Sequence, residues 1–95
     1  MLPPIILSIA GSDCSGGAGI QADIKTISAL GGYAASVITA VTAQNTLGVQ
    51  SVYPIPADMV KAQITSVMDD LRPDAVKIGM VHDAGIVTTI VDCLQ

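Results

Sequence analysis

The chain of 95 residues contains no phenylalanine, tryptophan or glutamate, and its only aromatic side chains are two tyrosines. With so few aromatic rings it has no stacking platform for single-stranded nucleic acid. Four basic residues against eight aspartates give a net charge of −4 without any basic cluster. This charge balance argues against binding to the phosphate backbone of DNA or RNA, so we expect no nucleic-acid partner.

Long apolar runs are also missing. Hydrophobic residues make up 51% of the chain and the mean hydropathy is +0.63. Even so, no uninterrupted apolar stretch reaches the ~18 residues that a membrane span needs. The start of the sequence carries no basic segment of the kind that opens a secretory signal. We expect a cytoplasmic protein without membrane contact, whose many apolar residues lie in strands buried on both faces of a parallel sheet.

Cysteine and histidine are scarce, with two cysteines, Cys14 and Cys93, and one histidine, His82. The cysteines lie far apart and lack the short spacing of metal ligands, so both are expected to be reduced thiols and no metal site is predicted. His82 has no serine or cysteine partner pattern around it, so we expect no catalytic role for it.

Strand-like and helix-like segments alternate along the chain. The apolar and β-branched segments predicted as strands are residues 4–10, 33–43, 49–54 and 75–80. Helices are predicted over residues 19–30, after Pro56, and from near Asp83. This alternation predicts βαβ units with right-handed crossovers and a mostly parallel sheet. The last helix lacks a glycine or basic residue at its end, so we expect the fold to continue beyond this chain.

A glycine-rich turn follows the first predicted strand, within IAGSDCSGGAGIQADIKT, residues 9–26. Such turns often hold phosphates, because backbone N–H groups and a helix N-terminus favour an anion. The Walker pattern fails here, since Gly17 and Ala18 stand where lysine and serine or threonine are required. GAGIQA, residues 17–22, matches the dinucleotide pattern, but the second strand ends without the acid that binds the ribose. Neither nucleotide pattern is complete.

Two aspartates and a lysine stand in or beside this framework. Asp23 falls within the apolar stripe of the helix over 19–30, so it is expected to be paired, hydrogen-bonded or at a cavity, unless it simply favours the start of the helix. Asp13 fits an ordinary turn residue whose carboxylate accepts backbone N–H groups. Lys77 interrupts a buried strand, and the simplest interpretation is a structural ion pair.

Gln44 ends the second predicted strand, where ligands of open α/β sheets bind. Its carboxamide offers a paired acceptor and donor, which fit a heterocycle carrying a ring nitrogen beside an exocyclic amine. The alternative is a loop glutamine that faces water. Val41 and Met80, near strand ends, are candidates for an apolar pocket or for ordinary core packing.

The run IAGSDCSGGAGIQADIKT, followed by SVITAVTAQNT, GVQSVYPI and VKIGM, closely resembles the start of the bacterial hydroxymethylpyrimidine/phosphomethylpyrimidine kinases of thiamine biosynthesis. The similarity extends over the whole chain, in order and without large gaps. It implies a three-layer, ribokinase-like α/β fold with helices on both faces of a mostly parallel sheet. Residues 1–95 are then expected to form the N-terminal portion of a single kinase domain, whose C-terminal half carries the catalytic residue and most of the ATP and Mg²⁺ site.

The resemblance also implies a function and a binding site. The reaction is ATP-dependent phosphorylation of 4-amino-5-hydroxymethyl-2-methylpyrimidine and then of its monophosphate, in a cytoplasmic homo-oligomer. The implied substrate-binding residues are Gln44 on the ring nitrogen and amine, Asp23 and Gly11 beside the hydroxymethyl group, and Ala18, Val41 and Met80 against the ring. None of these is a catalytic residue, so this chain alone is expected to be inactive. The alternatives are a pyridoxal kinase on the same scaffold, and a non-catalytic truncated chain or a half that pairs with a complementary chain.

Overall fold

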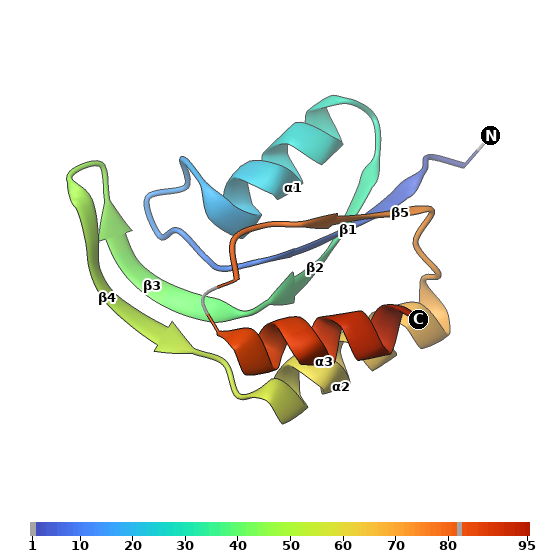
Figure 1. Cartoon of the computed structure of the whole chain (residues 1–95). Helices are drawn as coiled ribbons and strands as arrows, with labels where there is room; N and C mark the ends of the chain where they lie inside the picture. The colour runs from blue at the N-terminus through green and yellow to red at the C-terminus, as the bar shows by residue number, and fades with distance from the viewer. Residues whose placement is uncertain (1, 82) are drawn as a thin grey trace.

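The computed structural model describes residues 2–81 and 83–95, so the expectation for His82 lies outside the described residues. The elements follow one another as strand, helix, three strands, helix, strand and helix (Figure 1). Their bounds are β1 (Ile5–Ala10), α1 (Gly19–Ala29), β2 (Tyr33–Ile38), β3 (Ala40–Asn45), β4 (Gly48–Pro54), α2 (Ala57–Asp70), β5 (Ala75–Ile78) and α3 (Ala84–Leu94).

A parallel sheet with the order β2-β1-β5 forms the centre of the fold. Ile6 of β1 lies opposite Ala34 on one side and Ala75 on the other. Helix α1 covers one face of this sheet, and α2 and α3 cover the other (Figure 1). The expected three-layer α/β architecture is confirmed. No helix in the described ranges is long and apolar enough to cross a membrane.

The prediction of one continuous strand over residues 33–43 is wrong, because the chain changes sheets at Thr39. Residues before it pair with β1, whereas β3 and β4 form a separate antiparallel hairpin. The Thr39 backbone joins the two sheets, since its N–H donates to Ala10 O at 3.0 Å and its carbonyl accepts from Ile55 N at 2.9 Å. β-Branched residues favour extended backbone on both sides of this point, so residue pattern alone does not locate the change.

The main core lies between the sheet and the layer of α2 and α3. Alternate residues of β1 and β2 point to this side, as strand geometry requires. The buried residues of this core are Leu7, Ile9, Ala35, Val37, Val60, Ile64, Ile86 and Ile90. The opposite face of β1 carries Ser8, which is also fully buried and lies beneath α1. A buried hydroxyl needs a partner, and this one leads to the site described next.

Candidate functional site

A cavity of about 480 Å³ lies at the carboxyl ends of β1 and β5, between the glycine turn and the β3–β4 hairpin. Ligands of open α/β sheets bind at this edge. The lining residues are Ala10, Gly11, Ser12, Asp13, Ala18, Gly19, Ala40, Thr42, Gln44, Val49, Val52, Lys77, Gly79 and Met80. Residues far apart in the sequence therefore converge on one space large enough for a single heterocyclic ring.

Four of the six predicted binding residues, Gly11, Ala18, Gln44 and Met80, line this cavity. Val41 is not among the lining residues, because it alternates with Thr42 along β3, pairs with Tyr53 and leaves its side chain 48% exposed. Asp23 is also outside the lining and reaches the cavity only through Lys77. The binding roles of all six residues stay predictions.

The Asp13 carboxylate organises the glycine turn from within. It is 3% exposed, and one of its oxygens accepts the N–H and the hydroxyl of Ser15 at 2.9 and 2.6 Å. Its other oxygen accepts from Ala18 N at 2.8 Å. The Ser15 hydroxyl and the backbone N–H donors hold the pKa of Asp13 below its usual value, against the effect of burial, which raises it. The prediction that Asp13 is a turn-capping residue is confirmed.

Several N–H groups of this turn are used inside the protein. Besides those bound by Asp13, Ser12 N donates to Ala40 O at 2.9 Å, and Asp13 N donates to Gln21 Oε1 at 2.8 Å. A phosphate cradle requires such groups to be free and to face an electropositive space. Here the buried Asp13 carboxylate already accepts two of these N–H groups.

Gly19 allows the turn to pass close to β1. Its φ is +62°, and a Cβ atom at this position would lie 2.5 Å from the Gly11 carbonyl oxygen. Ile20 N donates to that same oxygen at 2.8 Å as α1 begins. Only glycine combines the left-handed backbone with this contact, so Gly19 fixes where the helix starts relative to the cavity.

Gln44 lies half-buried at the end of β3, beside an irregularity in the hairpin register between Ala43 and Gln44. Its Oε1 is 3.1 Å from the Thr42 hydroxyl, which also donates to Ser12 O at 2.6 Å. Its backbone is bound by Cys14, whose Sγ donates to Gln44 O at 2.8 Å and accepts from Gln44 N at 3.1 Å. These contacts hold the carboxamide at the cavity. Cys14 and Cys93 are free thiols, as expected.

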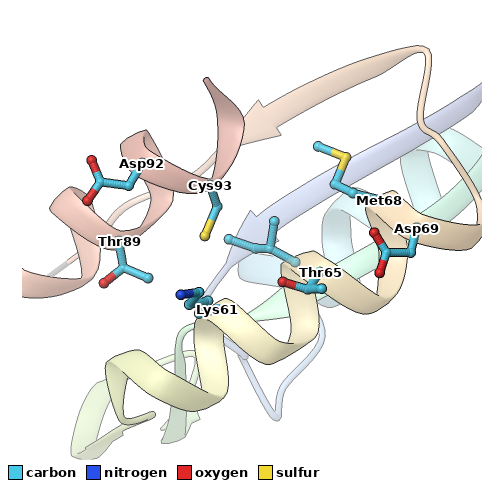
Figure 2. Close-up of a pocket in the computed structure, with 8 residues that line it drawn as sticks. Lys61, Thr65, Met68, Asp69, Thr89, Asp92 and Cys93 are labelled. Carbon is cyan, nitrogen blue, oxygen red and sulfur yellow. The ribbon is translucent and has the colours of Figure 1, made fainter.

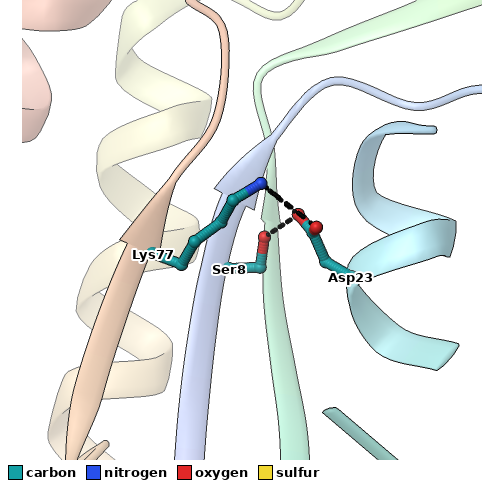
Figure 3. Close-up of polar contacts among 3 residues, drawn as sticks. All are labelled: Ser8, Asp23 and Lys77. Carbon is teal, nitrogen blue, oxygen red and sulfur yellow. Dashed lines mark hydrogen bonds and ion pairs between the residues drawn. The ribbon is translucent and has the colours of Figure 1, made fainter. Parts of the chain in front are cut away.

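Ser8, Asp23 and Lys77 form a polar cluster beside the cavity (Figure 3). Asp23 accepts from the Ser8 hydroxyl at 2.6 Å and from the Lys77 ammonium at 2.9 and 3.1 Å. Burial raises the pKa of Asp23, but the Ser8 and Lys77 hydrogen bonds and the lysine charge outweigh it, so the pKa is lowered overall. The predicted Lys77 ion pair is confirmed. Asp23 was expected either to be paired or simply to favour the start of the helix, and in the structure it is paired.

Acid should destabilise the fold through these two aspartates. Both have folded-state pKa values below the usual 3.8, so their stabilisation is complete above about pH 4 and is lost as the pH falls through the lowered values. We expect the urea midpoint, followed by circular dichroism, to stay level down to about pH 4 and to decrease steadily below it. Asp13→Asn should flatten that decrease, and an unchanged pH profile in this variant would contradict the assignment.

A second cavity, of about 460 Å³, lies between α2 and α3 on the other side of the sheet (Figure 2). Lys61, Thr65, Met68 and Asp69 of α2 face Thr89, Asp92 and Cys93 of α3 across it. None of the predicted binding residues lines this space. It arises from how the two helices pack, which the sequence pattern of either helix does not specify.

No group of three potential metal-ligating side chains occurs in residues 2–81 and 83–95. Mg²⁺ prefers several oxygen ligands in octahedral geometry. Asp13 and Asp23 are engaged by internal donors and lie in separate hydrogen-bond clusters. The described part of the chain therefore does not itself fit a magnesium site.

The structural neighbours of this chain are ribokinase-like kinases, and its parallel sheet, with helices on both faces and a cavity at the carboxyl ends of the strands, agrees with that class. Within that class the chain belongs to the phosphomethylpyrimidine kinase family, whose family model matches residues 13–95.

Individual relatives agree with this membership. The hydroxymethylpyrimidine/phosphomethylpyrimidine kinase of Salmonella typhimurium is 61% identical over 89 residues, which cover 94% of this chain and 34% of that protein. The crystal structure of phosphomethylpyrimidine kinase from Clostridium difficile 630 is 56% identical with a TM-score of 0.93, over 96% of this chain and 39% of that one. Pyridoxal kinase from Staphylococcus aureus, in complex with AMP-PCP and pyridoxal, is 33% identical with a TM-score of 0.86, over 97% and 34%. The chain spans about a third of the length of the curated relatives it matches, at 34% of the first.

Proposed function

We propose that residues 1–95 form the N-terminal portion of a single kinase domain and supply the pyrimidine-binding part of its active site. The reaction is ATP-dependent phosphorylation of 4-amino-5-hydroxymethyl-2-methylpyrimidine and of its monophosphate. The observation that carries this proposal is the position of the Gln44 carboxamide at a cavity of about 480 Å³ bounded by the glycine turn.

The chemistry of the cavity suits a small, flat, aminated ring. The Gln44 carboxamide can donate to a ring nitrogen and accept from the neighbouring exocyclic amine, as glutamine does with adenine. Ala18, Val49, Val52 and Met80 supply apolar surface for the faces of the ring. The glycine turn, already filled by the Asp13 carboxylate, leaves room for a ring but offers no cradle for a triphosphate.

The phosphate donor is inferred from relatives. AMP-PCP, an ATP analogue, is bound in the S. aureus pyridoxal kinase structure, and on that basis we propose ATP, with Mg²⁺ accompanying it, as the phosphate donor. Because the described residues do not fit a metal site, we assign no step of phosphate transfer to them. The role of this part of the chain is to bind and orient the pyrimidine and to exclude water from it.

The cellular setting belongs to the same proposal. We place the protein in the cytoplasm as a homo-oligomer that acts on a small molecule, without a nucleic-acid or membrane partner. Val41 and Tyr53, which are 48% and 66% exposed on the outer side of the hairpin, are apolar surface that a second copy could cover.

A pyridoxal kinase is the second candidate, because a structural neighbour of this chain has pyridoxal bound. Pyridoxal lacks the exocyclic ring amine that the Gln44 oxygen is proposed to accept from. Competition between the two compounds therefore separates the candidates. The aminopyrimidine should displace pyridoxal if the first proposal holds, and the reverse order of affinity would favour the second.

Gln44→Leu should weaken binding of the aminopyrimidine about 100-fold in calorimetric titration, because two polar ring groups lose partners worth about 1–3 kcal/mol each. The matched control is Gln50→Leu, a glutamine of the same hairpin outside the cavity, whose amide donates to Gly48 O. It should bind like the wild type. Equal affinities for the two variants would contradict the role of Gln44.

Pyrimidine-dependent ADP formation by the purified chain is not expected. Its detection would overturn the proposal that this part of the chain binds the pyrimidine but does not transfer phosphate.

A further inference from the structure

Lys77 is the only basic residue among the described residues that line the cavity beside Gln44. Its side chain is 53% exposed, and all four residues of β5 are exposed, so the prediction that Lys77 interrupts a buried strand is wrong. The one acid of the lining, Asp13, is nearly fully buried and is engaged by Ser15 and Ala18. A ligand in the cavity therefore meets an accessible ammonium group and no accessible carboxylate.

Asp23 and Ser8 fix the direction of this ammonium group. Both carboxylate oxygens of Asp23 contact Lys77 Nζ, at 2.9 and 3.1 Å, and one of them also accepts from Ser8. An ammonium group has three N–H donors, so at least one remains for a ligand. The carboxylate is only 19% exposed and is occupied by these donors. The polar group offered to a ligand at this wall of the cavity is thus the lysine rather than the aspartate.

We propose that Lys77 is a specificity-determining residue, whose ammonium group contacts the phosphate of phosphomethylpyrimidine and favours it over the unphosphorylated alcohol. This inference rests on the proposed function and adds to it the group that recognises the second substrate. Lysine binds phosphate as a point charge, and its attraction for a phosphomonoester dianion exceeds a single hydrogen bond to a neutral hydroxyl. Several N–H groups of the glycine turn are engaged internally, and Lys77 is the one positively charged donor that the described lining offers to a phosphate.

The test compares two affinities in each of three proteins. Dissociation constants for the hydroxymethyl and phosphomethyl pyrimidines are measured by calorimetry on the wild-type chain, on Lys77→Met and on Lys25→Met. Lys25 is the matched control, because it donates to Gly16 O at 2.8 Å but lies outside the cavity lining. The preference for the phosphorylated compound should fall at least about tenfold in Lys77→Met, as loss of a charged contact implies, and should be unchanged in Lys25→Met. An unchanged preference in Lys77→Met would overturn the inference.

A second measurement decides the question if Lys77→Met misfolds or if neither pyrimidine binds. Methyl phosphate is titrated into the wild-type chain, and the Cε resonances of Lys77 and Lys25 are followed by NMR. A saturable shift at Lys77 alone supports phosphate recognition by this lysine, whereas absence of pyrimidine binding refutes the proposed function and, with it, the specificity role that rests on it. No shift at Lys77, or equal shifts at both lysines, overturns the inference. Pyrimidine binding with no loss of preference in a folded Lys77→Met leaves the proposed function standing without this role for the lysine.

Discussion

Replacing Gly19 with alanine should lower the free energy of unfolding by about 2–4 kcal/mol. The new Cβ atom would clash with backbone atoms, and alanine does not favour the positive φ of this position. The added Cβ would lie 2.5 Å from Gly11 O and 3.3 Å from Asp13 N. Neither atom can move without breaking a contact of the turn, since Gly11 O accepts from Ile20 N and Asp13 N donates to Gln21.

Gly31→Ala is the matched control for this prediction. Gly31 also has a positive φ, +89°, but an added Cβ there has no atom within 4 Å. It should lose only the conformational term, about 1–2 kcal/mol. Urea unfolding followed by circular dichroism measures both variants. The difference between their losses in free energy of unfolding isolates the cost of the close contact between Gly19 and the Gly11 carbonyl. Equal losses at the two glycines would mean that this contact is not a constraint.

Leu7→Ala should have an effect of similar or greater size, a loss of about 2–5 kcal/mol, because it leaves a cavity in the middle of the core. Leu7 is fully buried on the central strand β1, where it faces the layer of α2 and α3. A small domain is stabilised by only about 5–15 kcal/mol in total. The variant is therefore expected to unfold at a much lower urea concentration.

Leu47→Ala is the corresponding surface control. Leu47 is 91% exposed in the turn of the hairpin, so its replacement should change stability by less than about 0.5 kcal/mol. A loss at Leu47 comparable to that at Leu7 would contradict the position of the core between the sheet and the two helices.

Features that depend on residues close together in the sequence could be predicted from the residue pattern. The parallel sheet followed from the alternation of apolar strands and amphipathic helices, and the capping role of Asp13 followed from its place in a glycine turn. For Asp23 the pattern left a paired carboxylate and a helix-start residue open, and for Lys77 it favoured an ion pair; in the structure the two residues pair with one another. The cost of burying a carboxylate without a partner makes an aspartate in an apolar helix stripe, such as Asp23, informative in sequence.

Features that depend on packing between distant segments were not predictable in this way. The division of residues 33–43 at Thr39 depends on backbone bonds to Ala10 and Ile55, which no local propensity encodes. That Lys77, and not Asp23, lines the cavity depends on the register of β5 against β1, which places Lys77 opposite Ser8. The second cavity depends on how α2 and α3 pack.

The central position of β1 has a consequence for the order of folding. Ile5 N, on its first residue, donates to Asp74, which follows 69 positions later, and Asp23 is paired by Lys77, which follows 54 positions later. The hairpin and α1 form from residues that are near one another in the sequence. The contacts of Ile5 with Asp74 and of Asp23 with Lys77 close large loops and therefore form slowly. During synthesis, one edge of β1 therefore lacks its partner strand until β5 has left the ribosome. The wall of the cavity that contains Lys77 accordingly forms after the glycine turn and the hairpin, which close over shorter separations in the chain.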